Sequence, residues 1–203
     1  MNQPESIACS IVLLGQFNPA IFHPAWLEAK GIETLGTAAY DGDLLTHRDV
    51  ASFSIDDRSY HVRPDRFQIE TPAPPWVTIL DITIKIFAEH LMHTPITAFG
   101  VNRTVHFRLS NISSRIKLGR MLAPIEPWGE YGQGMVTDDV GLTGGLQSLV
   151  MRQINPVPDE YSSETSVTIE PSVKISDHTG VYMHVNCHHA LKTCRENMEV
   201  GRQ

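Results

Sequence analysis

The sequence predicts an α+β fold, a largely antiparallel β-sheet with two to four helices packed on it. Two observations support this prediction. Segments in which apolar residues recur at every second position follow one another along the chain, as in strands joined by hairpins. Helical patterns are few, and they separate runs of strands instead of alternating with single strands as in a parallel α/β fold.

Length and composition limit the number of domains and the classes of partner to expect. A chain of 203 residues is of a size that predicts a single domain, residues 1–203. With 16 Lys and Arg against 23 Asp and Glu, the net charge of −7 makes nucleic acid an unlikely main partner. No apolar run approaches the roughly 20 residues that span a bilayer, so no membrane partner is expected.

The first strand and the first helix follow from local patterns. Residues 7–17 are apolar and partly β-branched, and they end at the turn pair Asn18–Pro19, which predicts a buried strand. Residues 24–31 begin with proline and end with glycine, which is typical of a short helix.

A polar stretch and a pair of strands come next. Residues 34–49 are polar and are expected to be mostly loop. Residues 50–56 and 59–71 alternate as strands do, with a turn at Asp56–Asp57 between them.

Residues 77–92 fit two structures. Within them, residues 81–86 alternate as a strand, whereas Leu80, Ile84 and Phe87 share one helical face. The alternatives stay open, although about 16 residues without a turn signal favour a helix.

The second half predicts a long strand, residues 96–109, and then a short helix that begins at Ile112 and is capped by Asn111. The glycine-rich residues 124–145 are expected to form the longest loop. The remaining predicted elements are strands over residues 146–155, 166–175 and 181–187 and a last helix from Ala190 with Leu191, Cys194 and Met198 on one stripe.

Histidines gather near the C-terminal end of the chain and raise the question of a metal site. The candidates for a transition metal such as zinc are His184, Cys187, His188 and His189. On a strand, His184 and His188 lie about 13 Å apart. One ion binds its ligands at about 2 Å, so a structural role is the favoured interpretation and the metal site is the alternative.

Little in the sequence supports a nucleophilic catalytic residue. Cys9 and Cys187 lie in apolar strands, where burial keeps a thiol protonated and inert. No Gly-x-Ser-x-Gly sequence is present. We therefore predict no catalytic residue and no cofactor-binding residue, and the odd number of cysteines, three, favours a reducing cytoplasm.

Three tryptophans are candidates for an interface. Trp26, Trp76 and Trp128 each follow closely on a proline, at predicted element ends or in loops. Exposed aromatic residues at such places are typical binding anchors. The alternative is that all three fill the edges of the core.

Several stretches carry a resemblance to a known family. They are Leu14–Trp26 (LGQFNPAIFHPAW), Thr94–Asn102 (TPITAFGVN), Ile169–Ser172 (IEPS) and Gly180–His188, which includes the pattern Val-Asn-x-His. Together they resemble a sporadically distributed bacterial family of about this length whose function is uncharacterised. The resemblance implies a bacterial cytosolic protein and an accessory role, defence against phage included, and it carries no catalytic residue.

These observations lead to a functional expectation. The chain is expected to be a non-enzymatic binding or assembly protein, either an oligomer or a subunit of a larger bacterial complex, so its partner would be another protein or a second copy. The alternative is a small metal-dependent or Cys-His enzyme that uses the histidine-rich C-terminal region.

Overall fold

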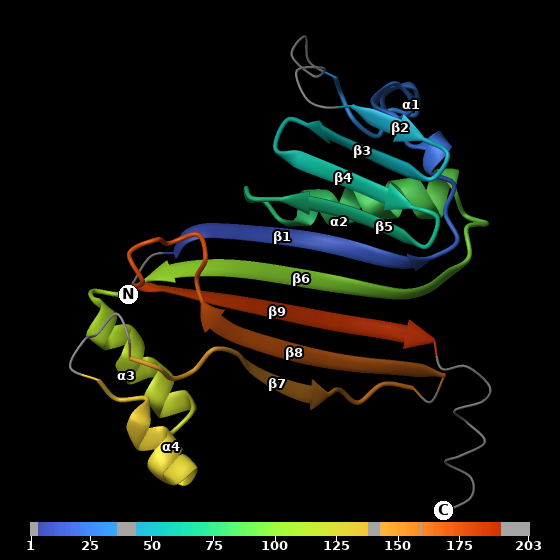
Figure 1. Ribbon diagram of the computed structural model, residues 1–203. Coiled ribbons are helices and arrows are strands. Elements are labelled where there is room, and N and C mark those ends of the chain that lie inside the picture. Colours follow the sequence, from blue (N-terminus) through green and yellow to red (C-terminus); the bar gives the residue numbers. More distant parts are fainter. Residues whose placement is uncertain (1–3, 36–43, 138–142, 159, 192–203) are drawn as a thin grey trace, which may run out of the picture. The chain divides into compact units, whose positions relative to one another are not determined.

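The described strands form one nine-stranded sheet in the order β2-β3-β4-β5-β1-β6-β9-β8-β7 (Figure 1). The structure is a computed structural model that describes residues 4–35, 44–137, 143–158 and 160–191. The strands are β1 (Pro4–Gly15), β2 (Leu45–His47), β3 (Val50–Ile55), β4 (Arg58–Arg63), β5 (Arg66–Thr71), β6 (Ile96–Arg108), β7 (Leu149–Ile154), β8 (Tyr161–Pro171) and β9 (Gly180–Leu191).

Four α-helices accompany the sheet in the described part of the chain: α1 (Pro24–Ala29), α2 (Val77–Ile84), α3 (Ile112–Leu122) and α4 (Gly129–Gly134). A π-helical turn, Lys85–His90, extends α2, and 3₁₀ turns cover Pro19–Ile21 and Glu126–Trp128. The predicted α+β fold with a largely antiparallel sheet is confirmed.

The described residues divide into two compact units. The first unit comprises residues 4–7, 104–137, 143–152 and 166–185, and the second comprises residues 8–35, 44–103, 153–158, 160–165 and 186–191. The division crosses β1, β6, β7, β8 and β9, and each unit is described by itself. The expectation of a single domain stays a prediction.

The second unit holds the main hydrophobic core. Strands β3, β4, β5 and β1 are joined by antiparallel pairs, with Tyr60 opposite Ile69 and Ile11 opposite Ile69 on the other side. Alternation buries Tyr60, Phe67 and Ile69 on one face of this sheet. Four phenylalanine rings pack together there, with centroids 5.0–6.5 Å apart, namely Phe17, Phe22, Phe67 and Phe87.

Residues 77–90 are helical, which decides between the two alternatives left open by the sequence. Ile79, Ile82 and Ile86 are spaced three and four residues apart, and all three are buried in the core. That spacing gives one face of a helix, whereas a strand would turn Ile79 and Ile82 to opposite faces. Packing against the core therefore outweighs the β-branched composition of this segment.

Two predictions for the region before α2 are wrong in part. Residues 59–71 form two strands, because Pro64 and Asp65 close a hairpin between β4 and β5. The polar stretch 34–49 contains strand β2, which pairs with β3 from Leu45 opposite Ser52 to His47 opposite Val50. Residues 36–43 of that stretch lie outside the described residues.

In the first unit, the predicted cap of α3 is confirmed, since Asn111 Oδ1 accepts a hydrogen bond of 2.8 Å from the Ser114 amide. The expected long loop over residues 124–145 is wrong in part, because 126–134 form a 3₁₀ turn and α4. Gly132 permits this tight packing: a Cβ there would lie 2.2 Å from the Ile125 carbonyl oxygen. Residues 138–142 lie outside the described residues.

The helix expected from Ala190 is wrong at its start. Strand β9 includes both Ala190 and Leu191, and the His189 ring stacks on Phe99 of β6 with centroids 4.6 Å apart. This cross-strand contact keeps the chain extended to the end of β9. Cys194 and Met198 lie outside the described residues.

No helix in the described ranges has both the length and the apolar character needed to cross a bilayer.

Candidate functional site

The predicted metal candidates all lie on β9 and are all partly buried. In the first unit, the His184 ring stacks on Tyr182. In the second unit, His189 stacks on Phe99, and Cys187 Sγ accepts a hydrogen bond from Thr165 Oγ1 at 3.7 Å. Among the residues that the structure describes, no three His, Cys, Asp or Glu side chains are grouped to hold a metal ion.

The Cys9 thiol is held in its protonated form. Burial raises the pKa of Cys9, and the nearby Glu70 carboxylate adds to this effect while Arg103 opposes it. A thiol with a raised pKa supplies little thiolate, which is the reactive form. Arg103 itself is exposed on β6.

The three tryptophans lie in different surroundings. Trp26 packs on Phe22 at the edge of the main core, with ring centroids 5.8 Å apart. Trp76 precedes α2 and is half-buried. Trp128 is 62% exposed, and its ring contacts the exposed Tyr131 at a centroid distance of 6.2 Å.

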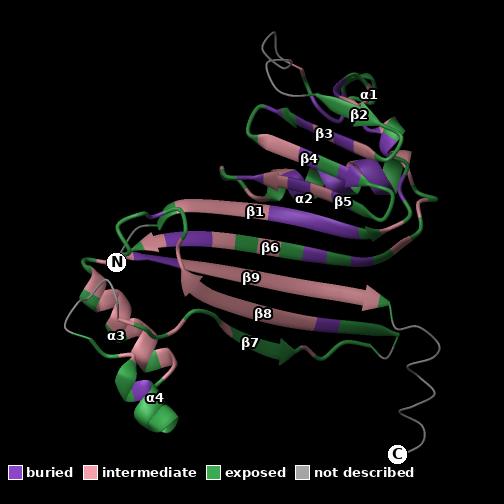
Figure 2. Cartoon of the chain, in the orientation of Figure 1, coloured by how far each residue is buried: buried purple, intermediate pink, exposed green. Residues whose placement is uncertain are grey.

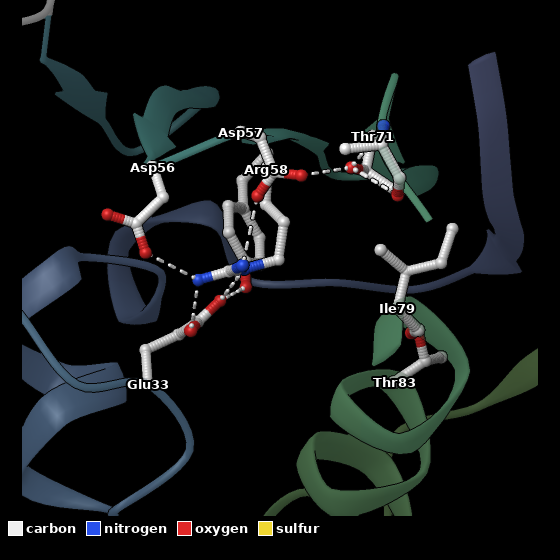
Figure 3. A network of polar contacts seen from close by, with 9 residues as sticks. Glu33, Asp56, Asp57, Arg58, Thr71, Ile79 and Thr83 are labelled. Carbon is white, nitrogen blue, oxygen red and sulfur yellow. Dashed lines mark hydrogen bonds and ion pairs between the residues drawn. The ribbon is translucent and has the colours of Figure 1, made fainter. Parts of the chain in front are cut away.

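The second unit contains a buried ionic network centred on Arg58 (Figure 3). The guanidinium donates to both oxygens of Glu33, at 2.9 and 3.0 Å, and to Asp56 and Asp57 at 3.0 and 3.1 Å. The side chains of Arg58 and Glu33 are only 16% and 5% exposed. Tyr60, fully buried, donates its hydroxyl to Glu33.

The hydrogen bonds of the network extend to Thr71. Asp57 also accepts a hydrogen bond of 2.8 Å from Thr71 Oγ1. Burial lowers the pKa of Arg58, but its hydrogen bond to Glu33 and the charge of Glu33 outweigh burial and raise that pKa. Burial raises the pKa of Tyr60, and the Glu33 charge raises it further. One cation faces three carboxylates, and each carboxylate accepts a hydrogen bond from the Arg58 guanidinium, so we interpret the network as a structural one.

The first unit contains a second candidate site, a cavity beside α3. It lies between α3, residues 143–146, the end of β8 and the start of β9. Arg115 and Arg120 line it, and the Nε atom of each is buried without a hydrogen-bond partner in the described part of the chain. This pairing of cavity and unmatched cations marks a candidate ligand site.

A further candidate site is the outer edge of β7, the last strand of the sheet (Figures 1 and 2). Five of its six residues, from Val150 to Ile154, are exposed. Val150 is 60% and Met151 is 63% exposed, so the strand presents apolar side chains as well as backbone.

The sequence analysis did not single out the α3 cavity or β7 as sites. A signal for the cavity was present: residues 112–122 include Arg115, Lys117 and Arg120 and no acidic residue, in a chain of net charge −7. No such signal exists for β7, because its place at the edge depends on the strand order.

No protein-family model matches the chain, and no curated protein matches its sequence.

Proposed function

We propose that this chain is a non-enzymatic assembly protein of the bacterial cytosol that pairs with a second copy of itself through β7. The observation that supports the proposal most directly is the exposure of Val150 and Met151 on the terminal strand of the sheet. The resemblance to a sporadically distributed bacterial family supports an accessory role for the assembly, such as defence.

An edge strand is a template for another strand, because one row of its N–H and C=O groups lacks a neighbouring strand. Proteins that stay monomeric commonly place charged residues or proline on such an edge. The sequence of β7, Leu-Val-Met-Arg-Gln-Ile, contains one charged residue and no proline. Its composition therefore favours pairing.

A two-fold axis makes the pairing self-complementary. Antiparallel pairing of β7 with its copy joins two equal edges and closes the assembly as a dimer, the commonest form of symmetric oligomer. A register with Met151 opposite the partner's Met151 places Arg152 opposite Val150. This register keeps the two arginines from facing one another across the strands.

The mass of the purified protein tests the proposal. Native mass spectrometry is expected to give twice the chain mass of 22.6 kDa. Replacing Val150 and Met151 with lysine should shift the protein to a monomer, because an edge carrying like charges repels its copy. The matched control is Val173→Lys, at an apolar residue 94% exposed outside the strands, which should leave the dimer intact.

Two results would contradict the proposal. One is a monomer at every concentration of the unmodified protein. The other is a dimer that persists in the double lysine variant. Recovery of a different protein from the host, released by the same variant, would replace the second copy with a subunit of a larger complex as the occupant of the edge.

A further inference from the structure

The α3 cavity of the first unit is small and partly open to solvent. Its volume is about 60 Å³, where one water molecule needs about 10–15 Å³ by the same measure. The walls include Arg115 and Arg120 from α3, Leu146, Glu170 and Val181. A space of this size admits a small ion or the head of a larger molecule.

Glycine at position 119 lets two of these walls meet. A Cβ on Gly119 would lie 3.4 Å from the Leu146 Cβ, so α3 approaches residues 143–146 to van der Waals distance at this position. The next segment of the wall comes from residues 169–171, part of the Ile169–Ser172 stretch. The cavity is thus formed by chain segments that are distant in sequence.

The two guanidiniums are the unusual feature of this cavity. The Nε atoms of Arg115 and Arg120 are buried, and no described residue forms a hydrogen bond with either. Within the described ranges, neither side chain forms an ion pair. A buried donor without an acceptor lowers the stability of the folded protein. An anion that enters the cavity and accepts the hydrogen bond restores that stability.

The charges around the cavity favour a dianion. Lys117 and Arg120 line an adjoining cavity, so three cationic side chains lie at or beside the site. Glu170 lines the same cavity, and its Oε1 already accepts a hydrogen bond of 2.8 Å from Ser148. Three positive charges and one negative charge leave +2, against about −1.5 to −2 for a phosphate group.

We propose that this cavity binds a phosphate group. Arg115 and Arg120 donate to its oxygens from inside the cavity, since the planar guanidinium matches phosphate geometry. Lys117 adds its charge from the adjoining cavity. The group is either the free ion or the phosphate of a small monoester whose remainder extends outward, because the cavity holds little more than the head group.

Calorimetric titration of the full chain at constant ionic strength tests the site. The probes are inorganic phosphate, glycerol 3-phosphate and acetate. Both phosphates are expected to bind saturably, and the tighter of the two identifies the source of the group. Acetate, with one charge, is expected to bind far more weakly. Acetate binding as tightly as phosphate, or no saturable phosphate binding, would overturn the proposal.

Substitutions separate this cavity from other basic surfaces. Arg115→Met and Arg120→Met should each weaken phosphate binding about tenfold or more, since each removes charge-assisted hydrogen bonds. Arg48→Met is the matched control, because that side chain is 84% exposed and is remote from α3 in the sequence. Glu170→Gln should strengthen binding, because it removes the one negative charge of the cavity and keeps an acceptor for Ser148.

Circular dichroism confirms that each variant is folded before it is titrated. Wild-type affinity in both arginine variants would overturn the site, and so would weaker binding in Glu170→Gln. The result is independent of the β7 pairing, because none of these residues lies on that strand.

Discussion

Arginine side chains have different surroundings in the two units of this protein. In the second unit, Arg58 is surrounded by Glu33, Asp56 and Asp57, and all four groups form ion pairs. In the first unit, the buried Nε atoms of Arg115 and Arg120 have no acceptor among the described residues. The described residues thus supply acceptors to Arg58 and supply none to these two Nε atoms.

This difference separates stabilising charges from binding charges. A buried charge that has its partner holds the fold together, and removing one partner is costly. A buried donor that lacks a partner lowers the stability of the folded protein, and a ligand that accepts its hydrogen bond restores that stability. The same substitution, arginine to methionine, should therefore lower the stability of the ligand-free protein strongly at Arg58 and little at Arg120.

The largest effect is expected from Arg58→Met. This change leaves the Glu33 carboxylate, 5% exposed, without its cation. Loss of one partner of a buried ion pair should lower the free energy of unfolding by about 3–5 kcal/mol. Urea denaturation measures it, and Arg48→Met, at an exposed pair, should change that free energy by less than about 1 kcal/mol. Equal effects of the two variants would show that the network does not stabilise the fold.

The next effect should appear only in the presence of phosphate. Without phosphate, Arg120→Met should unfold at nearly the same urea concentration as the unmodified protein, because no ion pair is lost. With phosphate at 100 times its Kd, the unmodified protein should gain about 2.7 kcal/mol and the variant much less. A variant as unstable as Arg58→Met in the absence of phosphate would break the distinction between the two sites.

A smaller effect is expected from Tyr60→Phe in the Arg58 network. The change removes the hydroxyl that donates to Glu33 and keeps the buried ring, which stacks on Phe53 at 4.9 Å. Loss of a hydrogen bond to a charged group should cost about 1.5–3 kcal/mol. The matched control is Tyr131→Phe, since Tyr131 is 70% exposed. A cost for Tyr60→Phe no larger than that of the control would remove the hydroxyl from the network.

The sequence predicted most of the elements because their signals are local. Asn111 caps α3 as expected, and alternation located β3 and β6. A distant contact decides where the local pattern is ambiguous or misleading. Residues 77–90, for which the sequence left helix and strand open, are helical because Ile79, Ile82 and Ile86 pack in the core. Ala190, expected in a helix, stays in a strand beside the Phe99–His189 contact.

The candidate sites were harder to predict than the fold. Arg115 and Arg120 are five residues apart on α3, and their missing partners could be recognised only when residues 143–146 and 169–171 were placed around them. Conversely, Glu33 and Arg58 are 25 residues apart, so no local pattern indicates that they pair. The terminal place of β7 likewise depends on the order of the whole sheet.

The smallest effect is a pH dependence in the first unit, where His106 extends the comparison. Its Nδ1 lies 2.7 Å from Ser172 Oγ, and its ring packs on Tyr182. Burial lowers the pKa of His106 from its ordinary value of 6.5, and the charge of Lys174 lowers it further. The contacts of His106 in the described residues are Ser172 and Tyr182, so protonation would form a cation beside no carboxylate of that part of the chain.

The sign of the pH effect follows from proton binding. Below pH 6.5 the unfolded chain binds a proton at this histidine more readily than the folded protein does, so the His106 contribution to stability is present above 6.5. It is lost as pH falls through the lower, folded pKa. Urea denaturation on both sides of pH 6.5 should show this loss in the unmodified protein and a shallower loss in His106→Gln. Equal slopes for the two proteins would mean that the neutral form of His106 is not favoured by folding.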